Sequence, residues 1–249
     1  MISYAYKTKN RKEEDIIYAH NCSEKDLGIR FYCPNPNCDA YMYLCNLKNP
    51  DIRPYFRATQ KSHPHIKDCK YTKISFKIED FDETTFDFEK ATESVMKPSR
   101  TGQESTTRGE TGQKRRRKLP PHTIKQIYEL AISNSIDFEY NGIKMWQLLA
   151  DKRSAHIYYK GVFRKCLVEG FFAGFNTNKN YIRMKYFIND SNLHYLRLKF
   201  YDNEVFNKTI KVFLEAKPLP VVVWGDWKPV KNYFQTIIHS LNQIYVPKK

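Results

Sequence analysis

The sequence predicts an α+β fold in two parts that are joined by a linker. Short apolar segments separated by prolines fill residues 1–90, and a stretch poor in apolar residues follows. The remainder, 123–249, carries two helical patterns and then three strand patterns, a helix and two more strands. We therefore expect a small β-rich domain, a disordered basic linker over 91–122, and a domain built on a five-stranded β-barrel with flanking helices.

Five short apolar segments of the first domain are predicted to form strands. They cover residues 2–7, 15–20, 30–33, 40–45 and 55–58. Strands this short bury little surface, so we expect the domain to need an additional cross-link. An acidic, aromatic run over 79–89 follows, and it fits either a last strand with a short helix or an irregular edge of the domain.

Several of the cysteines and histidines in this domain have the spacing of metal ligands. Cys33 and Cys38 bracket a turn that contains two prolines, and His65 lies four residues before Cys69. Three sulfurs and one nitrogen make a closed tetrahedral zinc site, which is a structural and not a catalytic role. His63 is an alternative to His65. The competing interpretation is that the cysteines are small buried residues and the histidines lie at the surface.

This part of the sequence resembles the N-terminal zinc-binding module of the CoiA-like competence proteins, over residues 1–75. The resemblance rests on Cys33 and Cys38, the aromatic and arginine run at 54–58, and the pair His65 and Cys69. It implies a structural zinc ion and DNA-related work in bacteria. The nuclease region that accompanies this module in those proteins is not obvious in this chain.

Residues 91–122 are predicted to form a disordered basic linker. From 92 to 121 the chain is rich in Ser, Thr, Gly, Gln and charge, a composition that cannot offset the entropy of ordering by burial. A cationic block at 114–118 includes Arg115, Arg116 and Arg117. These arginines are candidates to follow a phosphate backbone, and the alternative is that the block is only a solvated spacer.

The order of elements predicts the architecture of the second domain. Helical patterns begin at 122 and cover 145–149, strand patterns follow over 162–175, 181–188, 195–201, 221–224 and 236–246, and a helix over 203–216 separates the third strand from the fourth. This order resembles that of the oligonucleotide/oligosaccharide-binding (OB) barrel, over residues 155–249. In that fold the second and third strands form the ligand face.

The second and third strands carry the most informative pattern of side chains. One face alternates aromatic and basic residues, which are Tyr181, Arg183, Lys185, Phe187, Tyr195, Arg197, Lys199 and Tyr201. The interleaved residues are mostly apolar and point into a core, so these eight point outward. A three-residue loop at 190–192 sets Phe187 opposite Tyr195, Lys185 opposite Arg197, Arg183 opposite Lys199 and Tyr181 opposite Tyr201. Like charges facing each other destabilise a sheet, so the pattern favours a polyanionic ligand whose bases stack on the aromatic residues.

The distribution of charge also favours a polyanionic partner. Of the formal net charge of +15, residues 1–90 contribute +1, residues 91–122 contribute +5 and residues 123–249 contribute +9. Neither an apolar signal segment, a membrane-spanning run nor a basic amphipathic helix is evident. We expect a cytoplasmic protein that binds nucleic acid and no membrane, with its zinc module available to a protein partner.

The function that the sequence favours is binding of single-stranded DNA or RNA through this face, without catalysis. Two alternatives remain open. In one, the zinc module recruits a protein partner to nucleic acid. In the other, the chain is a magnesium-dependent nuclease that uses Asp202, Glu215 and Lys217, which are similar to the Asp and Glu-x-Lys arrangement of the PD-(D/E)xK nucleases. The helical spacing of 203–216 does not suit that chemistry, which needs acidic residues on adjacent strands.

Overall fold

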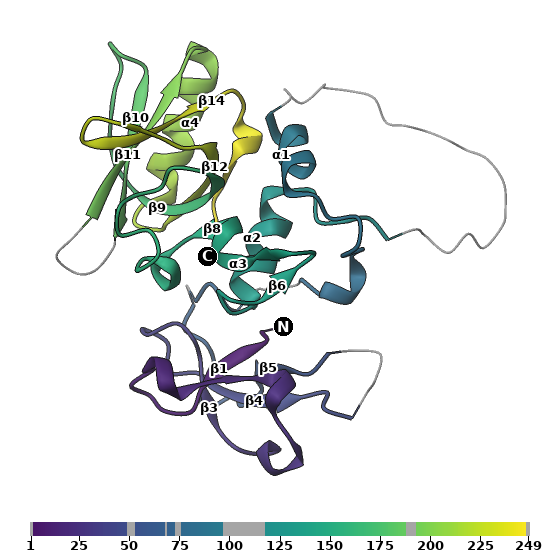
Figure 1. Cartoon of the computed structure of the whole chain (residues 1–249). Coiled ribbons are helices and arrows are strands. Elements are labelled where there is room, and N and C mark those ends of the chain that lie inside the picture. The colour runs from purple at the N-terminus through teal and green to yellow at the C-terminus, as the bar shows by residue number, and fades with distance from the viewer. Residues whose placement is uncertain are drawn as a thin grey trace, which may run out of the picture.

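The computed structural model describes residues 2–48, 53–67, 69–72, 76–96, 118–187 and 193–247 (Figure 1). The fold is α+β, as expected, with two principal sheets and four α-helices in this part of the chain. Figure 1 shows α2 and α3 between the two sheets. None of the helices in the described segments has the length and apolar character needed to cross a membrane.

The N-terminal sheet contains the five strands predicted for the first domain. They are β1 (Tyr4–Tyr6), β2 (Ile16–Tyr18), β3 (Phe31–Tyr32), β4 (Tyr41–Cys45) and β5 (Tyr55–Ala58), all antiparallel in the order β2-β1-β3-β4-β5. The Phe56 amide donates to the Ile2 carbonyl at 2.7 Å, which brings the last strand back to the start of the first. The curled sheet therefore encloses a small core, and Cys33, Cys38 and Cys69 are buried in it.

Side chains between residues 76 and 91 pack with the C-terminal part of the chain, which corrects the boundary expected at residue 90. Phe86 and Phe88 share one core with helix α2 (Ile124–Ser133), helix α3 (Met145–Leu148) and Trp224. Helix α1 (Phe88–Met96) begins in this segment, and Ala91 is buried in the same core. Residues 91–96 are thus helical and not part of a linker, because the aromatic residues before them are anchored against α2.

The C-terminal sheet is built around the predicted hairpin. Its strands are β8 (Leu149–Ala150), β9 (Lys165–Asn176), β10 (Tyr181–Phe187), β11 (Leu193–Phe200), β12 (Val221–Asp226), β13 (Lys228–Val230), β14 (Tyr233–Ile238) and β15 (Ile244–Tyr245). They run in the order β13-β14-β11-β10-β9-β12-β15, with β8 parallel to β9 and β11 parallel to β14. Helix α4 (Asn203–Ala216) connects β11 to β12, and β6 (Glu139–Tyr140) with β7 (Ile143–Lys144) forms a separate small hairpin.

The segment expected as one last strand over 236–246 is interrupted. Strand β14 ends at Ile238, a 3₁₀ turn follows at Leu241–Gln243, and β15 then pairs with β12. Backbone pairing does not close the sheet into the expected barrel, since β12 and β14 share no ladder within the described residues. The side-chain amide of Gln243 bridges them instead, donating to the carbonyls of Ile237 at 3.1 Å and Trp224 at 3.4 Å.

Strands β12 and β14 also approach each other closely at Gly225. A Cβ atom at this position would lie 2.4 Å from Oγ1 of Thr236, closer than real Cβ atoms come to a neighbour. Glycine at 225 therefore allows the two strands to pass without a clash.

A buried charged cluster joins the two principal sheets. The ammonium of Lys70 lies 3.0 Å from Glu169 on β9 and 3.7 Å from Asp151. Arg153 pairs with Asp151 at 2.8 Å and donates to the Tyr4 hydroxyl at 3.3 Å. Because each charge has an opposite partner, desolvation of these groups is offset by direct ion pairs. The interface between the sheets is thus fixed by polar contacts as well as by packing.

Candidate functional site

The loop between β3 and β4 places two thiols side by side. Its first residue, Cys33, donates its amide to the carbonyl of Ala40 at 3.2 Å, so the loop closes on the strand pair. Inside the loop the Cys38 amide donates to the Asn35 carbonyl at 3.0 Å, which makes the tight turn that its prolines favour. The backbone alone thus brings Cys33 and Cys38 to the same side.

The side chain of Arg11 donates hydrogen bonds to the backbone of this loop at two positions. Its Nε donates to the Cys33 carbonyl at 2.8 Å and its Nη2 donates to the Cys38 carbonyl at 2.6 Å. The guanidinium fork therefore fixes the spacing of the two cysteine backbones. We did not predict this role, because nothing local in the sequence connects Arg11 to a turn twenty-two residues further along.

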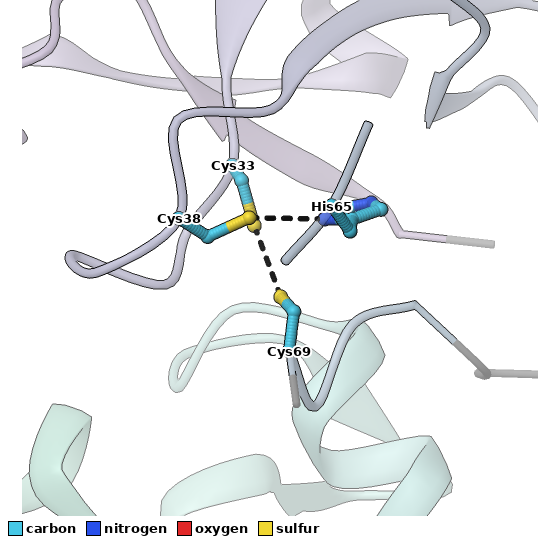
Figure 2. Close-up of side chains that lie close together, drawn as sticks. All are labelled: Cys33, Cys38, His65 and Cys69. Carbon is cyan, nitrogen blue, oxygen red and sulfur yellow. Dashed lines mark hydrogen bonds between the residues drawn. The ribbon is translucent and has the colours of Figure 1, made fainter. Parts of the chain in front are cut away.

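His65 and Cys69 complete a four-residue cluster with the two loop cysteines (Figure 2). All four ligand atoms lie within 4.8 Å of one another. The sulfurs of Cys33 and Cys69 are 3.6 Å apart, and Nδ1 of His65 is 3.4 Å from the sulfur of Cys38. In a tetrahedral zinc site the corresponding separations are about 3.8 Å and about 3.5 Å, from bond lengths of ~2.3 Å to sulfur and ~2.0 Å to nitrogen. The donor set and its spacing therefore fit a zinc ion.

The second histidine lies outside this cluster. The ring of His63 stacks on Tyr41, with centroids 3.9 Å apart and an angle of 11° between the planes. Its Nδ1 lies 3.1 Å from the Ser62 hydroxyl. Of the two histidines that the sequence left open, His65 is thus the one positioned to bind a metal.

The surroundings of the cluster suit a structural site. Cys33 and Cys38 are fully buried, Cys69 is nearly so, and His65 is half-buried. Hydrogen bonds from the Cys33 and Cys69 thiols lower the pKa of Cys38, which favours the thiolate that metals bind. Burial raises the pKa of Cys33, so a bound metal has to displace the proton of that thiol. With four protein ligands closing the site, no coordination position is left for a substrate.

Tyr181, Arg183 and Lys185 of β10 share one face of the sheet with Tyr195, Arg197 and Lys199 of β11, as predicted. Ile182, Met184, Leu196 and Leu198 are fully buried on the opposite face. Tyr201, just beyond the end of β11, is the most exposed of the aromatic residues, at 68%, and Tyr195 is 46% exposed. The loop at 190–192 lies outside the described residues, as do Arg115, Arg116 and Arg117 of the linker. Phe187 is placed only as the last residue of β10.

The register of the hairpin differs from the predicted one by two residues. Arg183 faces Arg197, Lys185 faces Tyr195, and Tyr181 faces Lys199. The prediction assumed a three-residue loop, whereas the last described pair, Phe187 with Leu193, encloses five residues. A shift of two preserves which side chains share a face, because the side-chain period of a strand is two. Only Arg183 and Arg197 form a like-charge pair directly across this ladder.

Tyr233 on β14 is a member of the same face that sequence reasoning missed. Its hydroxyl accepts a hydrogen bond from Nη1 of Arg197 at 2.7 Å, and the Arg197 guanidinium lies 3.8 Å from the centre of its ring. Tyr233 reaches this face because β14 pairs with β11, where Gln235 lies opposite Arg197 and Tyr233 is two residues before it. That pairing is parallel and joins strands distant in sequence, so no local pattern indicated it.

The residues of the nuclease alternative are not brought together. Asp202 caps the start of α4, where its carboxylate accepts hydrogen bonds from the amides of Glu204 and Val205. Glu215 and Lys217 lie at the other end of this fourteen-residue helix. At 1.5 Å per residue the two ends are about 20 Å apart. One magnesium ion therefore cannot bind both carboxylates.

Comparison with known proteins gives no relative for this chain. No family model matches it, and neither the curated proteins nor the solved structures include a match. Its function has to be inferred from the two sites themselves.

Proposed function

We propose that this protein binds single-stranded nucleic acid, DNA or RNA, on the outer face of β10 and β11. One observation carries the proposal: this face gathers two arginines, two lysines and several aromatic rings, and its central arginines face each other across the ladder. Cationic side chains neutralise phosphates, and exposed aromatic rings stack on bases without sequence preference. A ligand that supplies negative charge also relieves the repulsion between Arg183 and Arg197.

The topology of the sheet supports this assignment. Three antiparallel strands and a helix are followed by four strands, of which β12 pairs with β9 and β14 runs parallel to β11, and this arrangement is compatible with an OB-like architecture. In that architecture the β10–β11 hairpin corresponds to the second and third strands, which form the ligand face. Gln243 and Gly225 would replace the missing backbone ladder between β12 and β14.

We further propose that Cys33, Cys38, His65 and Cys69 bind one structural zinc ion. The separations of their ligand atoms and their burial support it. The resemblance of this module to that of the CoiA-like proteins agrees with a role connected with DNA.

Fluorescence anisotropy with a labelled single strand and its duplex tests the binding function. The titration is carried out at two salt concentrations and in the presence of magnesium. We expect preferential binding of the single strand and a steep loss of affinity as salt increases. Absence of binding to either form would overturn the proposal. Cleavage of the labelled strand would instead support the nuclease alternative, and the variant Glu215→Gln would then have to abolish it.

A further inference from the structure

The side chain of Arg197 is held between two tyrosines from the neighbouring strands. Its guanidinium carbon lies 4.2 Å from the ring centre of Tyr181 on β10 and 3.8 Å from that of Tyr233 on β14. Nη1 also donates to the Tyr233 hydroxyl at 2.7 Å. Arginine stacks well on aromatic rings, and two such contacts with a hydrogen bond restrict it to one position. Arg197 is therefore ordered before any ligand arrives.

The same contacts restrict which ligand group can reach Arg197. The rings of Tyr181 and Tyr233 lie within 4.2 Å of the guanidinium carbon, so they occupy positions from which a nucleobase could otherwise stack on Arg197. Nε is buried and has no hydrogen-bond partner in the described part of the chain. Arg197 is only partly buried, and the donors of a planar guanidinium suit the oxygens of a phosphate.

Arg183 is a second cation on the same face of the sheet. It pairs directly with Arg197 across the ladder, and its guanidinium lies over Gly174 on β9, where a Cβ atom would come within 3.3 Å of Nη2. The absence of a side chain at Gly174 thus leaves room for the Arg183 guanidinium beside β9. Two arginines that are paired across adjacent strands are therefore both available on this face.

We propose that Arg197 and Arg183 bind phosphates of the nucleic-acid backbone, and that Tyr181 and Tyr233 are positioning residues that hold Arg197 for this contact. The inference rests on the proposed function and deepens it, because it assigns different roles to the aromatic residues of one face. We assign base stacking to Tyr195 and Tyr201, which are 46% and 68% exposed. The expectation that Tyr181 stacks on bases is replaced by this positioning role.

Binding to two probes separates phosphate contacts from base contacts. One probe is a single-stranded oligothymidine, and the other is an abasic strand of the same length, which has the sugar-phosphate backbone without bases. Tyr181→Leu is expected to weaken binding to both probes by the same factor, about tenfold. It is also expected to reduce the salt dependence of log K by about 0.7, the value for one lost phosphate contact. The matched variants Tyr195→Leu and Tyr201→Leu should weaken binding to oligothymidine only.

A second variant keeps the test valid if Tyr181→Leu does not fold. Tyr233→Phe retains the ring on Arg197 and removes only the hydroxyl, and it should weaken binding to both probes by a smaller, equal factor. The inference is overturned if Tyr181→Leu or Tyr233→Phe affects oligothymidine alone, or neither probe. Wild-type protein that binds neither probe would overturn the proposed function and this inference with it. If the wild type binds both probes but Tyr181→Leu or Tyr233→Phe weakens binding to oligothymidine alone, only the inference is overturned.

Discussion

At the scale of single residues, two histidines that lie only two positions apart have different roles. His65 directs Nδ1 to the sulfur of Cys38, whereas the ring of His63 stacks on Tyr41. The sequence could not separate them, because both have an acceptable spacing to Cys69. The choice depends on where β4 places Tyr41, and this is a tertiary contact.

We predict that His65→Ala lowers the zinc content of the purified protein and its melting temperature. Removing one of four ligands opens the site and loses part of the folding free energy that a structural zinc supplies. The matched variant His63→Ala should keep its zinc, since it loses only a surface stacking contact. Elemental analysis and thermal unfolding measure both effects. Equal zinc content in the two variants would contradict this assignment of ligands.

At the scale of elements, the alternation of apolar and polar side chains predicted where most strands lie, but it did not predict their cross-strand register. The strands of the N-terminal sheet, strands β9 to β12 and helix α4 were found at or near their expected positions, because apolar periodicity depends only on which face is buried, whereas β8 and β13 were not predicted. The register was wrong by two residues, since it depends on the length of a loop. The break after Ile238 was also missed. It depends on Gln243, whose amide reaches two other strands.

The observed register makes a testable prediction about the hairpin. Arg183→Gln removes the like-charge pair with Arg197, so we expect roughly 0.5 kcal/mol of added stability. The same change should weaken binding of a single strand and reduce its salt dependence by about 0.7, because one phosphate contact is lost. Lys211→Gln on the exposed side of α4 is the control, because it removes the same charge. It should leave the stability and the binding of the single strand nearly unchanged. Denaturant unfolding and anisotropy titration measure the two quantities. A marked loss of stability in Arg183→Gln would show that this arginine is structural.

At the scale of the whole molecule, the metal cluster and the second sheet are linked through adjacent residues. Cys69 belongs to the cluster, and the next residue, Lys70, lies between Glu169 and Asp151. The composition of the sequence predicted two domains. It could not predict the contact of Lys70 with Glu169 and Asp151, because charged residues are normally expected at the surface. The module and the larger sheet are therefore positioned relative to each other by buried ion pairs.

Among the residues of this interface, Asp151 is the one whose substitution should lower the free energy of unfolding most. We predict that Asp151→Asn lowers the free energy of unfolding by about 3 kcal/mol at neutral pH, because Arg153 would remain buried without its carboxylate. Asp226→Asn, which removes an exposed pair with Lys228, is the control and should cost less than about 1 kcal/mol. Denaturant unfolding measures the difference between each variant and the wild type.

The pH dependence of this difference provides an independent test. Burial alone would raise the pKa of Asp151, but Arg153 and Lys70 hold it below its usual value. A carboxyl group whose pKa is lowered on folding contributes stability above its unfolded pKa, and that contribution is lost as the pH falls through the folded pKa. The advantage of the wild type over Asp151→Asn should therefore stay constant from pH 7 to about pH 4 and narrow only below about pH 4. A difference that already disappears near pH 6 would assign the stabilisation to a histidine and not to Asp151.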